Sequence, residues 1–198
     1  MKTGLLVKYS GILAALAAVL FVVGFVIHPA TEDSTGMKEA GWIPAHALLF
    51  IASVFGFAGW IGIYSKQSDK TGSIGLIGFV LLFAGTVLLA AITYSASVYA
   101  PIIALNAPQV IDSLGPDSLP VTLEILTVLL VMVGGIIFGY SSLLAKVFQK
   151  WPSVLVAVGA LLLGVGNIVV PGIIGLIGAV IFAAGQLWMG VELYKKQG

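Results

Sequence analysis

Six long apolar stretches, almost free of charged residues, constrain this chain more than any other feature of its sequence. Each could cross about 30 Å of hydrocarbon as a helix, since a helix rises about 1.5 Å per residue. The runs are continuous rather than alternating, which favours helices over a membrane β-barrel. We therefore expect an all-α integral membrane protein with a single transmembrane domain over residues 1–198. The six expected helices lie near 5–28, 43–65, 72–97, 120–146, 152–170 and 172–194.

Composition supports this expectation and excludes several kinds of function. Hydrophobic residues make up 60% of the chain and charged residues 9%, whereas a soluble domain carries about 25% charged residues. The lipid bilayer is therefore the expected main partner. A net charge of +1 without a basic run excludes a nucleic-acid partner. The absence of Cys excludes disulfides and thiolate chemistry, and no catalytic or nucleotide-binding motif assigns an enzyme class.

The distribution of lysine predicts an orientation in the membrane. Eight of the nine basic residues fall on one side of the expected helices, namely Lys2, Lys8, Lys66, Lys70, Lys146, Lys150, Lys195 and Lys196. Lys38 alone falls on the other side. The lysine-rich side of a multi-pass protein faces the cytoplasm, so both termini are expected inside the cell membrane and loops 29–41 and 100–120 outside. The apolar run at 11–27 exceeds a signal-peptide core, and we expect a retained first helix.

One glycine pattern occurs twice, at 71–85 and at 171–185, with nine of fifteen positions identical. The expected helices that carry it run in opposite directions. This predicts an inverted three-plus-three repeat with halves 1–100 and 118–198, although convergence on a common packing vocabulary stays open. In either case glycine lets membrane helices approach closely, which predicts a compact, glycine-rich bundle. The expected packing positions are Gly72, Gly75, Gly78, Gly85, Gly172, Gly175, Gly178 and Gly185.

Three ionisable residues lie at the expected outer ends of the helices. His28 ends the first helix, His46 opens the second, and Glu124 lies in the first turns of the fourth. Because one loop joins the first two helices, we expect His28 and His46 to be neighbours. Two imidazoles and one carboxylate could hold a divalent metal, contact a haem or relay protons. Each residue also has a local interpretation. His28 could cap helix carbonyls, His46 could hydrogen-bond nearby, and Glu124 could interact with the positive end of its helix. Neither a metal nor a haem is assigned by spacing alone.

A stripe on the second expected helix suggests a pocket for a flat hydrophobic ligand such as haem, quinone or lipid. It follows 4-3-4-3-4 spacing and consists of His46, Phe50, Ser53, Phe57, Trp60 and Tyr64. Such a stripe is also typical of ordinary helix packing, and that interpretation stays open. The candidate pocket-lining residues are Trp42, Phe50, Ser53, Tyr94 and Asn167.

The segment from His28-Pro29 through an acidic loop to Trp42-Ile-Pro-Ala-His46 resembles a group of small prokaryotic six-helix membrane proteins. The resemblance covers about half of the chain, mainly its first three expected helices. It implies an architecture and no activity.

Four hypotheses about function follow from these patterns. The first is a transporter- or channel-like protein with an outward-facing pocket formed by His and Glu, because inverted repeats often flank a substrate path. The second is a redox or sensor protein that binds haem, a metal or a quinone through His28 and His46. The third is an accessory subunit that packs into a homo-oligomer or a larger membrane complex. The fourth is a lipid-acting enzyme with Glu124 and His46 as acid and base.

Overall fold

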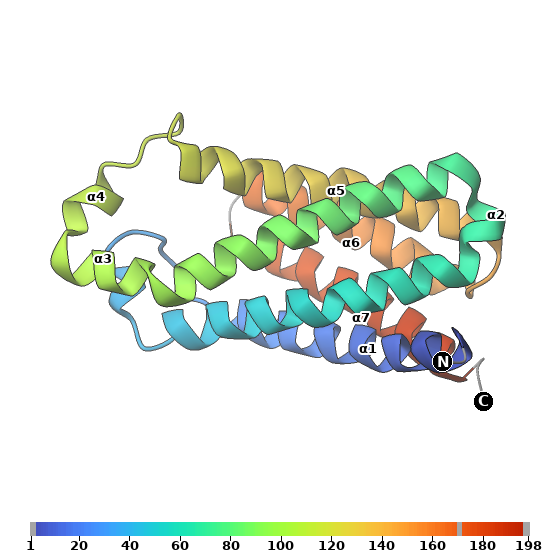
Figure 1. Cartoon of the computed structure of the whole chain (residues 1–198). Helices are drawn as coiled ribbons and strands as arrows, with labels where there is room; N and C mark the ends of the chain where they lie inside the picture. Colours follow the sequence, from blue (N-terminus) through green and yellow to red (C-terminus); the bar gives the residue numbers. More distant parts are fainter. Residues whose placement is uncertain (1–2, 170–171, 196–198) are drawn as a thin grey trace.

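The computed structural model describes residues 3–169 and 172–195, and every regular element in them is helical. This confirms the all-α expectation. Five helices are long and apolar enough to cross a membrane. Figure 1 shows how the helices are arranged. The elements are α1 (Thr3–Ile27), the 3-10 helix η1 (Gly36–Lys38), α2 (Trp42–Val98), α3 (Ala100–Asn106), α4 (Pro108–Asp112), α5 (Leu119–Ala145), α6 (Lys150–Ile168) and α7 (Ile173–Lys195).

Helix α2 contains two of the expected membrane helices, because the chain reverses within it. The expected link near 66–71 is helical, and the reversal occurs at Gly72, whose φ of 57° and ψ of −156° suit glycine. Two arms result, the first arm of α2 (42–71) and the second arm of α2 (73–98), and they lie side by side. The stacked rings of Tyr64 and Phe79, 4.4 Å apart, join the arms near the reversal. The five long helices therefore form six bundle-spanning segments.

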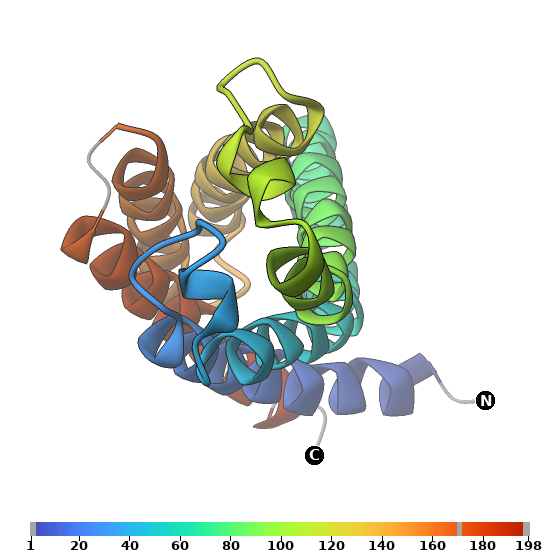
Figure 2. The ribbon, with the colours of Figure 1, turned by 90° about the vertical axis from the view of Figure 1, so that its left-hand side faces the viewer.

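The six segments follow one another around the bundle in chain order. Helix α1 packs on the first arm of α2, where Ala14 lies against Gly59. The second arm packs on α5, α5 on α6, α6 on α7, and α7 returns to α1. Figure 2, which views the bundle from one end, shows the resulting ring. A ring of this kind leaves room between its walls, whereas a bundle with a central helix does not.

Most of the repeated glycines mark close approaches between helices, as expected. A Cβ atom at Gly78 would lie 2.6 Å from the backbone nitrogen of Phe138 in α5. A Cβ at Gly185 would lie 2.7 Å from the backbone nitrogen of Val156 in α6. Gly85, Gly175 and Gly178 also meet a neighbouring helix. These helices can pack backbone to backbone only because the side chains are missing.

Three of the eight expected packing glycines have other surroundings. Gly72 and Gly172 have positive φ values of 57° and 124°, and a Cβ at either would meet nothing within 4 Å. They are turn residues, not packing residues. Gly75 faces Thr71, which lies on the other side of the reversal at Gly72. The expectation was wrong at these positions because the glycine pattern runs through a turn before it enters the helix.

The chain order of the ring does not support the expected inverted repeat. Gly78 and Gly85 face α5, the helix that follows them, whereas Gly178 and Gly185 face α6, the helix that precedes them. The disagreement is also geometric. If a two-fold axis in the membrane plane related the two halves, the helices of one half would follow one another clockwise and those of the other half anticlockwise, seen from one end. Here all six segments circle in one direction, so halves 1–100 and 118–198 are not related by such an axis.

The two ends of the bundle differ in charge. We call the end that carries η1, α3 and α4 the loop end, and the opposite end, where α1 begins and α7 ends, the terminal end (Figure 1). Among the described lysines, Lys38 lies at the loop end, and the terminal end holds Lys8, Lys66, Lys70, Lys146, Lys150 and Lys195. Between the ends the outer surface is apolar: Ile77 is 53% exposed and Val80 is 51% exposed. Such a surface suits lipid contact.

The loop end is ordered by contacts between the two long connections. Asp112 of α4 accepts hydrogen bonds from the backbone N–H and the hydroxyl of Ser34, at 3.0 and 2.9 Å. Segment 100–120, expected as an outer loop, contains the two short helices α3 and α4. These hydrogen bonds join the connection that carries η1 to the one that carries α3 and α4.

Candidate functional site

A cavity of about 1340 Å³ occupies the loop-end half of the ring. All six segments contribute side chains to it, together with the connections that carry η1, α3 and α4. Its volume exceeds the roughly 300–1,000 Å³ of common ligand pockets. The ring in Figure 2 is seen from this end. The cavity is thus a direct consequence of arranging six helices in a closed ring without a central one.

Aromatic side chains form the floor of the cavity. Trp60 and Phe182 line its deep end, with ring centroids 5.6 Å apart. Phe138, completely buried, packs edge-on against Trp60 at 5.6 Å. On the far side of this layer the Gln67 amide donates a hydrogen bond of 2.7 Å to the hydroxyl of Ser142. Neither Gln67 nor Ser142 lines the cavity, which therefore ends at the aromatic layer.

The two histidines meet at the wall of the cavity. The Nε2 atoms of His28 and His46 lie 3.3 Å apart. The Nδ1 atom of His28 lies 2.7 Å from the carbonyl oxygen of Pro29, and that of His46 lies 2.9 Å from the carbonyl oxygen of Trp42. Trp42 fixes this group, because its indole N–H donates 2.8 Å to the carbonyl of Ala96 on the second arm of α2. The expectation that α1 and α2 bring these residues together is fulfilled.

Four carboxyl groups line the cavity: Glu32, Asp33, Asp112 and Glu124. No Lys side chain in 3–169 or 172–195 lines it. The backbone N–H groups of Gly36 and Thr35 and the Thr31 hydroxyl donate to Asp33, and they hold the pKa of that carboxyl below its usual 3.8. Asp33 is therefore charged at neutral pH. The loop end of the cavity has an acidic lining without a basic counterpart.

Glu124 lines the same cavity as the histidines but does not join them in a cluster. Among residues 3–169 and 172–195, no group of three or more His, Asp or Glu side chains is close enough to hold a metal ion. Glu124 belongs to α5. His28 follows the end of α1 and His46 lies in the first turns of α2, on another part of the cavity wall. The expected arrangement of two imidazoles and one carboxylate is thus present only as the imidazole pair.

The aromatic stripe on the first arm of α2 divides between two roles. His46, Ser53 and Trp60, seven residues apart, line the cavity. The other three residues of the stripe pack against the second arm: Phe50 on Tyr94 and Phe57 on Phe83, both at 5.6 Å, and Tyr64 on Phe79. Three residues of the stripe therefore belong to the cavity wall and three to helix packing.

Among the candidate pocket-lining residues, Trp42, Ser53 and Asn167 line the cavity. Phe50 and Tyr94 lie outside it and pack on each other, so their expected position was wrong. The expectation failed because helical spacing defines a face of α2 but not the fold-back that covers half of that face. Lining residues that were not expected include Thr86 and Gln186, which carry no distinctive sequence signal.

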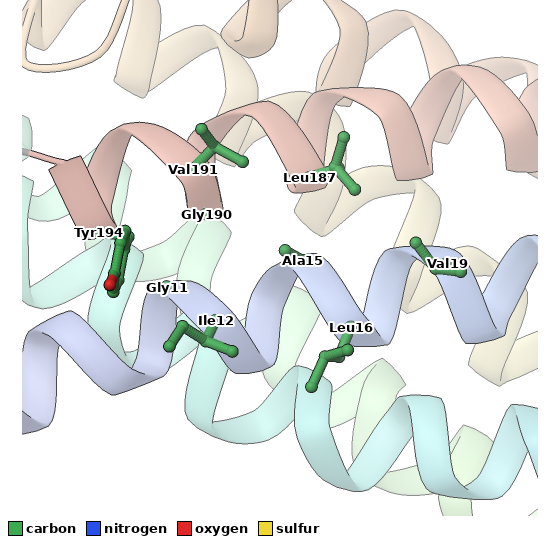
Figure 3. Close-up of a pocket in the computed structure, with 9 residues that line it drawn as sticks. All are labelled: Gly11, Ile12, Ala15, Leu16, Val19, Leu187, Gly190, Val191 and Tyr194. Carbon is green, nitrogen blue, oxygen red and sulfur yellow. The ribbon is translucent and has the colours of Figure 1, made fainter.

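A second hollow lies between α1 and α7 near the terminal end, with a volume of about 250 Å³ (Figure 3). It forms where Gly11 and Gly190 bring the two backbones together. Aliphatic side chains make up most of its wall, and Tyr194 contributes the one side-chain polar atom drawn there. Its lining is Gly11, Ile12, Ala15, Leu16, Val19, Leu187, Gly190, Val191 and Tyr194. The shape and the apolar wall of this groove suit a lipid chain, but it has no arrangement of polar groups for specific recognition.

Comparisons with known proteins add no assignment. No protein-family model matches the chain, and neither a curated protein nor a solved structure is detectably similar to it. The cavity and its lining are therefore the basis for assigning a function.

Proposed function

We propose that this chain is a small, transporter-like multi-pass membrane protein that binds an amphipathic organic cation in the loop-end cavity. The observation that carries this proposal is that acidic and apolar lining residues occupy different parts of the cavity. Acidic groups lie at the loop end of the cavity, and aromatic and aliphatic groups lie at its floor. A ligand with a positive head and an apolar body matches both regions at once.

The electrostatic part of the proposal comes from the four lining carboxyl groups. Ser34 donates hydrogen bonds to the carboxylate of Asp112, and a backbone N–H group donates to that of Asp33. These neutral donors stabilise the two negative charges without cancelling them. No ion pair involving Glu32 or Glu124 is present in the described part of the chain. A concave site of one charge sign, surrounded by low-dielectric walls, concentrates counter-ions. The matching counter-ion here is a cation.

The deep part of the cavity is more apolar than its residue names suggest. The hydroxyl groups of Ser53, Thr86 and Thr127 donate to carbonyls one turn earlier in their own helices, at 2.7 to 2.8 Å. Their hydrogens are therefore engaged, and little donor capacity is left for a ligand. Together with Trp60 and Phe182 they form a surface suited to apolar and aromatic ligand groups, including cation–π contact.

The lysine distribution supports an orientation for this cavity. In the proposed topology the lysine-rich terminal end faces the cytoplasm and the loop end faces outward. The ligand would then enter from outside the cell membrane. Transport would further require Trp60, Phe138 and Phe182 to separate, because their packing closes the path toward the terminal end.

The second candidate, a redox or sensor protein, is favoured by the His28–His46 contact. A haem held between the two side chains does not fit this arrangement. Two axial imidazoles approach haem iron from opposite faces of the ring, and an Nε2–Nε2 distance of 3.3 Å leaves no room for that plane. The pair fits a smaller occupant better than a haem.

The charge preference can be tested with two hydrophobic ions of similar shape and opposite sign. We expect the protein in nanodiscs to bind tetraphenylphosphonium, measured by quenching of tryptophan fluorescence and by calorimetry. Replacing both Glu32 and Glu124 by Gln is expected to weaken this binding about tenfold, since each lost charge removes a fraction of a kcal/mol to about 1 kcal/mol of attraction.

Glu39→Gln is the matched control, because Glu39 is an exposed loop-end carboxylate that does not line the cavity. It should bind tetraphenylphosphonium as tightly as the unmodified protein. Tetraphenylborate serves as the anionic counterpart. Equal or tighter binding of tetraphenylborate would contradict the proposal.

A further inference from the structure

We propose that the Nε2 atoms of His28 and His46 form a two-imidazole site for a first-row transition-metal ion at the wall of the loop-end cavity. This inference goes beyond the binding of an organic cation and does not depend on it. Three observations carry it: the hydrogen bonds at Nδ1, the distance between the Nε2 atoms, and the inclination of the two rings.

The hydrogen bonds at Nδ1 determine where the protons lie. A backbone carbonyl can only accept a hydrogen bond, so Nδ1 of His28 and Nδ1 of His46 must each carry the proton donated to it. In a neutral imidazole the other nitrogen then has none. Both Nε2 atoms therefore present lone pairs toward each other at 3.3 Å. Two facing lone pairs repel, so either a proton or a metal ion between them would stabilise the pair.

The same hydrogen bonds are those of metal-bound histidines. Such a ligand usually donates its second ring N–H to a carbonyl or carboxylate, which fixes the tautomer and the ring orientation. Here both members of the pair do so through Pro29 and Trp42. The indole of Trp42 also packs on the His46 ring at 4.2 Å. His46 is only 6% exposed, so its orientation is fixed before any ion arrives.

The distance fits a metal ion. Two nitrogen ligands at about 2.0–2.1 Å from a tetrahedral ion lie about 3.3 Å apart, which matches the separation of the Nε2 atoms. The ring centroids are 4.7 Å apart, and the ring planes are inclined by 57°. If the two lone pairs pointed straight at each other, the centroids would be farther apart. The two lone pairs therefore do not point along one line, and a bent arrangement of this kind is compatible with an ion bound beside both Nε2 atoms.

The type of ion follows from the ligands. Neutral imidazole suits zinc, copper and cobalt, whereas magnesium and calcium prefer oxygen. Both histidines line the cavity, and no third His, Asp or Glu in the described residues completes the cluster, so the remaining coordination positions would be open to water or a ligand. Open positions are typical of catalytic and ligand-exchanging sites rather than structural ones. The acidic lining adds cation attraction without direct coordination.

The composition of the chain makes the test direct. His28 and His46 are its two histidines, and it has no cysteine, so any imidazole coordination must come from this pair. The tag-free protein in nanodiscs would be titrated with Co²⁺, followed by its visible d–d absorption and by calorimetry. We expect one Co²⁺ per chain, displaced by Zn²⁺, and loss of the absorption band in His28→Ala and in His46→Ala. Glu39→Gln should retain the band.

His46 is buried, and its replacement could disturb the fold. A second measurement on the unmodified protein therefore accompanies the titration. In protein labelled with ¹⁵N at histidine, both Nδ1 resonances should show an attached proton, and Zn²⁺ should shift both Nε2 resonances. Unmoved Nε2 resonances, or Co²⁺ binding no tighter than in the His28→Ala/His46→Ala double variant, would overturn the metal site. Neither result depends on binding of tetraphenylphosphonium.

Discussion

Replacing Gly178 by Ala is expected to lower the free energy of unfolding by about 1–3 kcal/mol, the usual cost of overpacking a filled interior. A Cβ at this position would overlap the backbone nitrogen of Leu163 in α6. Neither partner is a flexible side chain, so the two helices themselves have to move apart. The measurement is thermal unfolding in mild detergent, where the variant should melt several degrees below the unmodified protein.

The control for Gly178→Ala is Gly56→Ala. Gly56 is also buried and helical, but a Cβ there would find its nearest neighbour, Cγ2 of Thr86, at an ordinary 3.7 Å. Alanine has the higher helix propensity by up to about 1 kcal/mol, so this variant should be as stable as the unmodified protein or more so. If the two variants melted at the same temperature, the backbone-to-backbone packing of α6 and α7 would be wrong.

Replacing Gly56 by Trp is expected to remove tetraphenylphosphonium binding, with a loss in affinity of at least about tenfold. Gly56 lines the deep part of the cavity beside Trp60. An indole projecting from it would occupy the volume that the apolar body of the ligand needs. The binding assay is the one described for the charge variants, and it would be run on protein that elutes as a single species.

Ile61→Trp is the control for this steric block. Ile61 lies five residues further along the same arm of α2, is 46% exposed and does not line the cavity. It adds the same side chain on the outer surface and should leave binding unchanged. Full binding by Gly56→Trp would show that the ligand does not use the deep part of the cavity.

The sequence was sufficient to predict the helices and the meeting of the two histidines. Both depend on local properties. Apolar length determines a spanning segment, and a single connection between two consecutive helices brings the end of α1, with His28, close to the start of α2, with His46. The positions of Trp42 and Ser53 on the cavity wall follow from the same helix face.

The sequence could not predict the partners of each helix. Gly78 and Gly178 occupy the same position in the repeated pattern, yet one packs on α5 and the other on α6. A glycine specifies a close approach but not the helix that approaches, and the inverted repeat failed as an expectation for that reason. Phe50 and Tyr94 were misplaced similarly. Their mutual contact exists only because α2 folds back at Gly72.

The cavity and its lower boundary can be tested through three positions on α5. Val128 lines the cavity, Leu129 is next in sequence but faces outward with 39% exposure, and Ser142 is completely buried beyond the aromatic layer. The chain contains no cysteine, so each position can be replaced singly by Cys in an otherwise unreactive background. The probe is a membrane-impermeant trimethylammonium-ethyl thiosulfonate added from the outside of intact cells.

The account predicts that the reagent modifies Val128→Cys and leaves Leu129→Cys and Ser142→Cys unmodified. A water-accessible thiol ionises and reacts, whereas a thiol in lipid or in a packed core does not. Modification of Val128→Cys that is slowed by tetraphenylphosphonium would place the cation in the cavity. An unreactive Val128→Cys, or reaction of Ser142→Cys at the same rate, would contradict a cavity that opens outward and ends at Trp60, Phe138 and Phe182.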